Sequence, residues 1–335
     1  IFWNLVLGIY NFLTVMAKPY LLSGIDIGNS EVKVVIAKVE RDGLRPEILG
    51  VGTASSHGLR RGMVVDMEET INDVATAVQR AEATAGVKLK RAYVAVNGLH
   101  IKNQISRGVI AVSRADNEIS QSDIDRVLQA ASVVSLPANR EIVHVVPRNF
   151  IIDGTENVKN PLGMKGVRLE AEVLIIDGLS PYLRNLVKCV NENGLEVAGL
   201  VFAPLAASLS VLDKNQREYG VAHLDFGGGI STLTIFEEAD LIHSAVLPIG
   251  SRHITNDLAM ALRTSMDVAE QIKLAHATIG MTEDLRKREN LDLSKLMGEE
   301  NFILPKKQLI RVIDARVSEF LELVTAELKK ALALS

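Results

Sequence analysis

The segment Gly24-Ile-Asp-Ile-Gly-Asn-Ser-Glu-Val-Lys33 decides the fold, because its pattern returns as His223-Leu-Asp-Phe-Gly-Gly-Gly-Ile-Ser-Thr232. Each segment reads as a short apolar strand that ends in Asp-x-Gly, turns through small residues and re-enters an apolar strand. The tip of such a unit presents backbone N–H groups that suit a phosphate. An aspartate just before the turn can hold the water shell of Mg²⁺. The pair therefore predicts a duplicated fold that clamps a nucleotide.

The two turns supply most of the candidate nucleotide ligands. Asp26 and Asp225 are expected to hold Mg²⁺ through water. Three consecutive glycines weaken a strand, and close backbone approach to a ligand explains such a run after Asp225. Glu270 and Lys273, one helical turn apart, either bracket a base or ribose or form a plain surface ion pair. The predicted cofactor-binding residues are Asp26, Gly28, Asn29, Ser30, Lys33, Asp225, Gly227, Gly228, Gly229, Ser231, Thr232, Gly250, Glu270 and Lys273.

Composition places the chain among soluble globular proteins of two or more domains. It has 335 residues, of which 47% are apolar and 23% charged. The net charge of −4 gives no sign of nucleic-acid binding. A single cysteine, Cys189, excludes an intrachain disulfide and a cysteine-based metal cluster. The seven histidines show no HExxH or paired spacing, so a structural zinc site is not expected.

Apolar periodicity predicts alternating strands and helices, which is the rhythm of an α/β protein. Residues 97–177 break this rhythm and read as a small α+β insertion. Strands are expected at 21–28, 31–39, 45–53, 91–96, 99–112, 141–152, 167–177, 196–202, 221–226, 230–236 and 240–247, and helices at 67–85, 121–135, 181–193, 204–212, 254–263, 266–277 and 306–334.

Three stretches fall outside this pattern. Residues 1–17 carry no charge, and their length is borderline for a membrane span. They are interpreted either as translation upstream of a start at Met16 or as a genuine N-terminal anchor. Residues 281–305 are charged and irregular, which predicts a solvated loop. At Ser335 the chain stops inside a helical pattern, so it looks like a fragment.

The two turns, with Glu270 and Lys273, resemble the nucleotide cleft of the actin, heat-shock ATPase and sugar-kinase superfamily. Within it the chain resembles the FtsA family of bacterial cell-division proteins, from about residue 20 to its end. The segments that carry this resemblance are Gly50-Val-Gly-Thr53, Gly58-Leu-Arg-Arg-Gly62, Tyr93-Val-Ala-Val-Asn-Gly98, His144-Val-Val-Pro147, Lys159-Asn-Pro-Leu-Gly-Met-Lys-Gly-Val-Arg168 and Phe202-Ala-Pro-Leu-Ala-Ala-Ser208.

The resemblance implies an actin-like (ribonuclease H-like, duplicated) fold that binds ATP and Mg²⁺ and polymerises with itself. It also implies a link between the tubulin-like protein FtsZ and the cytoplasmic membrane at the division septum. The membrane contact would use a C-terminal helix absent from this chain. In the family's terms, residues 18–96 and 178–217 form subdomain 1A, 97–177 the inserted subdomain 1C used for self-contact, 218–253 the start of 2A, and 254–335 an incomplete 2B that meets FtsZ.

Two departures from the superfamily bear on catalysis. Heat-shock ATPases place Glu before Pro at the first interdomain helix, where this chain has Ala203-Pro204. The missing carboxylate implies ATP hydrolysis that is slow at most, and no catalytic residue is expected. The chain also ends before the later Gly-Gly adenosine motif, which leaves the base pocket incomplete. Alternatives are a pilus-assembly scaffold of the PilM family, against which the Lys159–Arg168 loop counts, and a sugar kinase or true ATPase, against which Ala203 counts.

Overall fold

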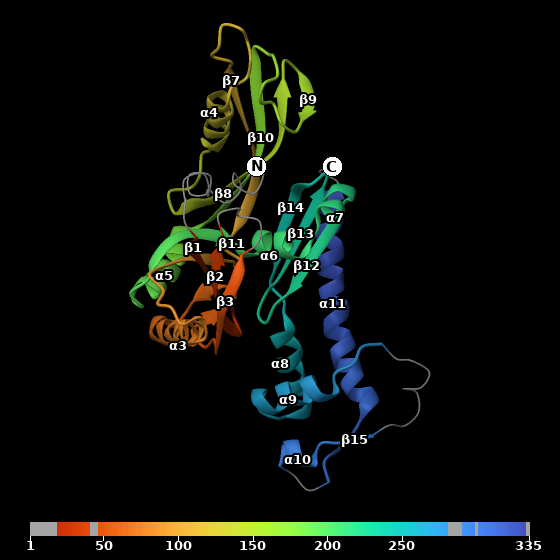
Figure 1. Ribbon diagram of the computed structural model, residues 1–335. Coiled ribbons are helices and arrows are strands. Elements are labelled where there is room, and N and C mark those ends of the chain that lie inside the picture. The colour runs from red at the N-terminus through yellow and green to blue at the C-terminus, as the bar shows by residue number, and fades with distance from the viewer. Residues whose placement is uncertain (1–18, 41–45, 281–289, 299–300, 333–335) are drawn as a thin grey trace. The chain divides into compact units, whose positions relative to one another are not determined.

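The computed structural model describes most of the chain (Figure 1). The apolar extension predicted at 1–17 lies outside the described part. Within that part, no helix is both long enough and apolar enough to cross a membrane. The described residues are 19–40, 46–280, 290–298 and 301–332.

Two compact units make up the chain. The first consists of residues 1–225 and 232–246, and the second of 226–231 and 247–335. Sheets dominate the first unit and helices the second, which confirms the predicted α/β class.

A five-stranded sheet of order β11-β6-β1-β2-β3 forms the centre of the first unit. β1 pairs antiparallel with β2, and β2 with β3, so these three strands form a meander. β6 joins β1 in parallel, and β11 joins β6. The elements are β1 (Tyr20–Ile27), β2 (Glu31–Val39), β3 (Glu47–Ser55), β6 (Arg91–Val96) and β11 (Glu196–Phe202), with a separate short hairpin of β4 (Leu59–Arg60) and β5 (Met63–Val64).

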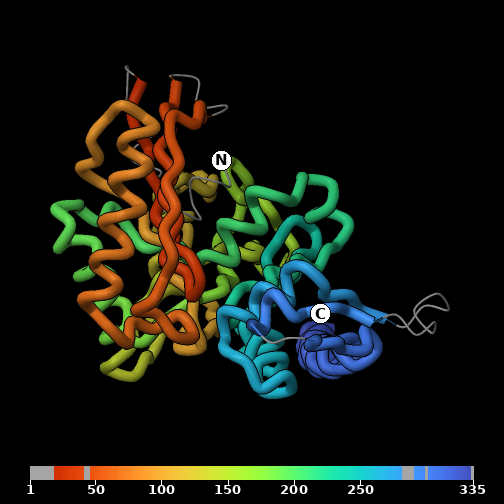
Figure 2. The backbone as a smooth tube through the Cα atoms, turned by 90° about the horizontal axis from the view of Figure 1, so that it is seen from below, coloured from red at the N-terminus to blue at the C-terminus, as the bar shows by residue number. Residues whose placement is uncertain are grey.

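Helix α3 (Met67–Ala85) lies along this sheet, and two glycines let it approach closely (Figure 2). A Cβ atom on Gly52 would lie 2.0 Å from the carbonyl oxygen of Ala77, and one on Gly50 would lie 2.5 Å from that of Ala81. Such distances leave no room for a side chain. The Gly50-Val-Gly52 pattern therefore sets the packing of α3 on β3.

The predicted insertion is an antiparallel sheet of order β7-β10-β8-β9 covered by one helix. It has its own apolar core. Gly108 brings α4 close to β7, because a Cβ atom there would lie 2.5 Å from the carbonyl oxygen of Val127. The elements are β7 (Lys102–Ala111), α4 (Gln121–Ser132), β8 (Arg140–Ile152), β9 (Thr155–Val158) and β10 (Arg168–Leu179).

After the insertion the chain returns to the central sheet and then forms a three-stranded sheet of order β12-β13-β14. Ala203 stands at the first position of the helix that follows β11, where the sequence places it. The elements are α5 (Ser180–Asn191), α6 (Ala203–Val211), α7 (Lys214–Tyr219), β12 (Val221–Phe226), β13 (Ser231–Glu237) and β14 (Asp240–Leu247).

The second unit packs its helices around a core that includes Leu258, Ile272 and Ile313. The prediction of an irregular loop over 281–305 is wrong for its described residues from 290 onward. There, buried Leu293 and Leu304 anchor a small hairpin and a helical turn. The elements are α8 (Ser251–Leu262), α9 (Met266–His276), β15 (Asn290–Asp292), α10 (Ser294–Met297), β16 (Ile303–Pro305) and α11 (Lys306–Leu332).

Most predicted elements are present with shifted ends. Asp66 caps α3, because its side chain accepts the N–H of Glu69. Helix α8 begins at Ser251 rather than at residue 254. The sequence does not predict β4, β5, β9 or α7, because segments this short carry too little periodicity.

Polar contacts fasten the insertion to β14 within the first unit. Lys159 Nζ lies 2.6 Å from Asp240 Oδ2 and 3.3 Å from Glu238 Oε2. Asn103 Nδ2 donates to the carbonyl oxygen of Ser244 at 2.6 Å. Burial raises the pKa of Asp240 to about 6, although the neighbouring Lys159 ammonium acts in the opposite direction. The insertion is therefore held by side chains as well as by its two chain connections.

His144 connects the insertion to the central sheet through a buried hydrogen bond. Its Nε2 accepts the N–H of Phe202, at the end of β11, at 2.9 Å. The residue is 7% exposed. Burial lowers the pKa of His144 from 6.5 to about 4. A protonated ring could not accept this bond, so the fold requires the neutral form.

Stability should fall as the pH drops from 6.5 to about 4, because the unfolded chain binds more protons than the folded chain in this window. The expected contribution of His144 is up to about 3 kcal/mol. Urea unfolding at about pH 7 and about pH 4.5 measures it. His144→Gln should reduce the loss and His276→Gln, on α9, should not. His100, whose pKa is also lowered to about 4, adds to this slope, whereas Asp240, whose pKa is raised to about 6, opposes it. An unchanged slope in His144→Gln would contradict this account.

Candidate nucleotide-binding site

The first glycine turn joins β1 to β2 and is closed by the backbone. The N–H of Gly28 donates to the carbonyl oxygen of Glu31 at 2.9 Å, and a Cβ atom on Gly28 would lie 2.8 Å from that oxygen. Ser30 lies exposed at the tip, and its carbonyl oxygen accepts the N–H of Ser56 at 3.0 Å. Glycine is therefore required for a turn this tight.

Three charged residues of the first unit lie close to one another at this turn. Asp26 and Lys33 are cross-strand partners in the register of β1 and β2, so their side chains share a face. Water reaches the Asp26 carboxylate, but surrounding protein displaces much of it and raises the pKa of Asp26. Lys33 lowers this pKa and Asp225 raises it. A divalent cation between the two carboxylates would relieve their repulsion.

Lys33 and Asn29 have partners in the protein itself. Lys33 Nζ lies 3.7 Å from Glu31 Oε2, and its side chain is 55% exposed. Asn29 is buried, and its Oδ1 accepts the N–H of Gly62 at 3.1 Å. The Asn29 side chain thus supports the neighbouring segment 58–62. Contact of either residue with a phosphate stays a prediction.

The second glycine turn repeats the geometry of the first. A Cβ atom on Gly227 would lie 2.6 Å from the carbonyl oxygen of Ile230, three residues on, just as one on Gly28 would meet Glu31. The carbonyl oxygens of Gly227 and Gly228 accept the N–H groups of Ser251 and Arg252 at 2.9 and 2.8 Å. The first turn of α8 is therefore bonded directly to this glycine turn.

The contact between α8 and the second glycine turn also explains why residue 250 is a glycine. A Cβ atom on it would lie 2.5 Å from the carbonyl oxygen of Gly227 and 2.6 Å from that of Gly228. Its backbone N–H lies 3.1 Å from Nδ1 of His253 in the first turn of α8. Gly250 thus permits the packing of α8 against the turn, and its predicted contact with a phosphate stays a prediction.

The two hydroxyl residues after the second turn are buried. Ser231 Oγ donates to the carbonyl oxygen of Ile249 at 2.7 Å, and the residue has no exposed surface. Thr232 is 1% exposed, and its Oγ1 has no hydrogen-bond partner among the described residues. The Ser231 hydroxyl therefore has a structural partner, which weakens the case for its predicted contact with a nucleotide.

Glu270 and Lys273 belong to a group of three side chains rather than to a plain surface pair. Lys273 Nζ lies 2.7 Å from Glu270 Oε2 and 3.0 Å from Thr255 Oγ1. The Lys273 side chain is only 12% exposed. Burial would raise the pKa of Glu270, but hydrogen bonds from Lys273 and Thr255 outweigh it and lower that pKa. Sequence spacing could not reveal Thr255, because it lies on α8 and its partners lie on α9.

The predicted nucleotide ligands fall on both units. In the first unit, Lys33 and Asp225 both act on the charge of Asp26. In the second unit, Gly250 packs against the backbone of Gly227 and Gly228. The first unit holds Asp26, Gly28, Asn29, Ser30, Lys33, Asp225 and Thr232, and the second holds Gly227, Gly228, Gly229, Ser231, Gly250, Glu270 and Lys273.

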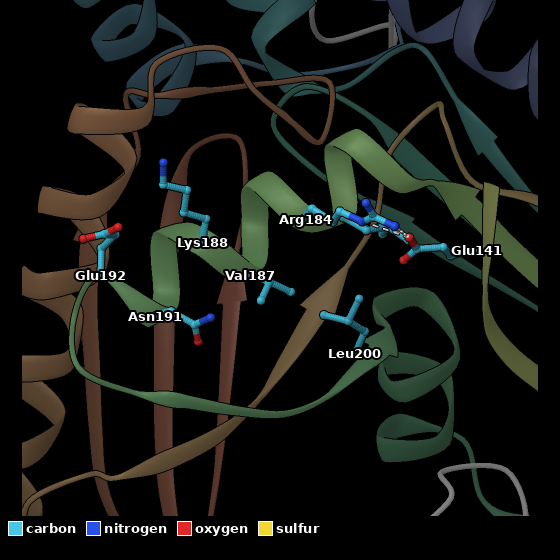
Figure 3. A pocket seen from close by; sticks show the side chains of 8 residues that line it. Glu141, Arg184, Val187, Lys188, Asn191, Glu192 and Leu200 are labelled. Atoms are coloured by element: carbon cyan, nitrogen blue, oxygen red, sulfur yellow. Dashed lines mark hydrogen bonds and ion pairs between the residues drawn. The ribbon is translucent and has the colours of Figure 1, made fainter. Parts of the chain in front are cut away.

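A pocket of about 330 Å³ lies elsewhere in the first unit, where α5 meets β8 and β11 (Figure 3). Arg184 and Glu141 form an ion pair at one end of it, and the Val187 and Leu200 side chains lie near each other. None of the predicted nucleotide ligands lines this pocket. It is lined by Glu141, Leu183, Arg184, Val187, Lys188, Asn191, Glu192 and Leu200.

Comparison with known proteins identifies the family. The model of the SHS2 domain inserted in FtsA matches residues 98–177, and that of cell division protein FtsA matches residues 222–330. FtsA of Bacillus subtilis is 38% identical over 316 residues, which cover 94% of this chain and 71% of that protein. FtsA of Escherichia coli is 34% identical over 308 residues, which cover 92% and 72%. The chain belongs to the FtsA family.

Solved structures place the FtsA-family chain among actin-like folds. The PilM–PilN type IV pilus biogenesis complex matches with a TM-score of 0.56 and 15% identity, over 76% of this chain and 69% of that one. MreB 5 of Spiroplasma citri bound to AMPPNP matches with a TM-score of 0.52 and 12% identity, over 94% and 79%. These identities show the fold alone, and they confirm the actin-like fold predicted from the sequence.

Gly250→Ala should destabilise the protein by about 1–3 kcal/mol, because the added methyl group meets backbone oxygen atoms that cannot rotate away. Urea unfolding measures the change. Gly24→Ala is the matched control, since a Cβ atom at Gly24 meets nothing within 4 Å. Equal unfolding midpoints for the two variants would contradict the assignment.

Proposed function

We propose that this chain binds ATP and Mg²⁺, polymerises, and links FtsZ polymers to the cytoplasmic membrane at the division septum. Membership of the FtsA family carries the proposal. The two glycine turns support its nucleotide-binding part, because both have the same close backbone approach and each begins two residues after an aspartate on a strand.

The donor chemistry of the first unit fits a hard cation. Asp26 and Asp225 would supply oxygen ligands, and the Asp225 carboxylate disfavours the negative charge of Asp26. Backbone N–H groups of the two turns would meet the phosphates, and Lys33 would add a positive charge. Lys273, Glu270 and Thr255 would meet the ribose or base. When bound, Mg²⁺ would neutralise negative charge on the phosphates.

Nucleotide hydrolysis is not a necessary part of this function. Ala203 occupies the first position of α6, where a heat-shock ATPase has a glutamate. A methyl group can neither orient a water molecule nor accept a proton from it. ATP would therefore act chiefly as a ligand that stabilises one shape of the protein. Steady-state turnover of the order of 1 s⁻¹ or faster would contradict this part of the proposal.

The partner contacts would use separate surfaces. The inserted SHS2 domain would make the self-contact, and the helices of the second unit would meet FtsZ. Large apolar side chains on α8 and α9 are exposed there, including Met260 at 72% and Leu274 at 77%. Exposed apolar groups of this size are candidate anchors for a partner.

Lys273→Ala and Asp26→Asn should each weaken ATP binding by about tenfold or more, since each removes a charged partner. Titration with a fluorescent ATP analogue, with and without Mg²⁺, measures this. Asp26→Asn should act mainly on the Mg²⁺-dependent part of the affinity. Because the pKa of Asp26 is raised, that part should decline on acidification earlier than for an ordinary aspartate. Lys307→Ala, an exposed lysine of the second unit, is the control, and equal losses in it would contradict the assignment.

Leu274→Asp should weaken co-sedimentation with FtsZ polymers by about tenfold or more, because it places a charge on an exposed apolar contact. Pelleting is measured with and without lipid vesicles, and ATP binding is measured in parallel to verify the fold. Ile48→Asp, at an apolar side chain of the first unit that is 64% exposed, should leave pelleting unchanged. If the unmodified chain does not pellet with FtsZ at all, the FtsZ-binding part of the proposal is wrong.

A further inference from the structure

Three potential metal ligands lie together on the first unit, apart from the glycine turns. His57 follows the end of β3, and Glu69 and Asp73 lie four residues apart on α3. Their ligand atoms, one per residue, all lie within 4.8 Å of one another. None of the three is among the predicted nucleotide ligands.

The hydrogen bonds of Asp73 orient its carboxylate so that it could bind a metal ion together with His57. Its Oδ2 accepts the backbone N–H of His57 at 2.7 Å, and its Oδ1 lies 3.1 Å from His57 Nδ1. Two donors bound at about 2.1 Å to one tetrahedral ion lie about 3.4 Å apart, so the observed separation of 3.1 Å needs only a small adjustment. A carboxylate that binds metal through one oxygen is commonly held by a hydrogen bond to the other. The His57–Asp73 pair has this arrangement.

Glu69 adds a third potential ligand to the pair, in the first turn of α3, where the helix dipole also favours an acidic side chain. The His57–Asp73 contact alone would fasten the segment after β3 to α3. Glu69 adds a second negative charge one helical turn from Asp73, and like charges at this spacing destabilise a helix. Among the described residues, no ion pair or hydrogen bond engages the Glu69 carboxylate. A divalent cation would neutralise both carboxylates.

The cluster is buried on the side of Asp73 and open to solvent on the side of His57. Asp73 is 8% exposed and is fixed by the helix, whereas the His57 side chain is 61% exposed. Solvent can therefore deliver an ion and supply the remaining ligands. One imidazole nitrogen with two carboxylate oxygens suits a borderline transition metal, whereas Mg²⁺ and Ca²⁺ prefer oxygen alone.

We infer that His57, Glu69 and Asp73 bind one divalent transition-metal ion, with zinc as the ion that best fits this donor set. The bound ion would connect the end of β3 to the first and second turns of α3. His57 immediately precedes the segment 58–62, whose Gly62 N–H is bonded to Asn29 in the first glycine turn. The ion would thus brace the segment that supports this turn. The inference does not depend on the proposed function.

Calorimetric titration of chelator-treated chain with Zn²⁺, free of nucleotide, tests the site. One saturable site is expected. His57→Ala and Glu69→Gln should each raise its Kd by about tenfold or more. Glu68→Gln is the matched control, because Glu68 is an exposed glutamate next to Glu69 on the same helix. Asp26→Asn should leave zinc binding unchanged, which separates this site from the Mg²⁺ ligands.

A second readout reports on the ligands themselves. Co²⁺ in place of Zn²⁺ should give a visible absorption spectrum that changes in His57→Ala. Zn²⁺ should raise the Tm of the unmodified chain by more than that of Glu69→Gln at the same concentration. Glu69 is exposed, so this variant keeps the fold. Zinc binding that is absent, or that has the same Kd in the unmodified chain, His57→Ala and Glu69→Gln, would overturn the inference.

Discussion

Close backbone approach at the glycine turns is the constraint on which the rest of the structure depends. Gly28 and Gly227 each leave less than 3 Å between a would-be Cβ atom and the carbonyl oxygen three residues on. A larger residue at Gly28 would open the turn and disturb the register that sets Asp26 opposite Lys33. Gly250 extends the same constraint to a helix, because α8 bonds to the carbonyl oxygens of the second turn. The glycines of the turns thus position charged side chains such as Asp26 and Lys33.

The sheet β12-β13-β14 connects the predicted Mg²⁺ ligands to the inserted domain. Asp225 lies near the end of β12, and Asp240 begins β14 of the same sheet. Lys159 of the insertion pairs with Asp240, and Asn103 bonds to Ser244. Any displacement of this sheet must therefore either break these contacts or carry the insertion with it. Hydrogen-bonded side chains, rather than a free linker, join the proposed nucleotide residues to the proposed self-contact.

Long periodic segments could be predicted from the sequence, and contacts between segments could not. The strands around Asp26 and the helix that Asp66 caps follow from apolar spacing and local caps. Thr255 could not be found, because its contact with Lys273 depends on how α8 packs on α9. The hairpin after residue 290 was hidden by its charged neighbours, since only a few apolar residues such as Leu293 bury it. The cluster around His57 likewise depends on the packing of α3 against the end of β3.

In the proposed function, Ala203 would separate the binding of a nucleotide from its hydrolysis. In the proposed function, the turns and the Lys273 group contribute binding energy, and nothing at the start of α6 converts it into hydrolysis. A ligand that is held but not cleaved stabilises the form that binds it by about 2.7 kcal/mol at one hundred times its Kd. That stabilisation lasts as long as the ligand stays bound, so dissociation rather than turnover would set the lifetime of the bound shape. A protein proposed to hold a partner and its own neighbours in a filament would benefit from slow or absent hydrolysis. Each copy would then keep its nucleotide-bound shape until the nucleotide dissociates.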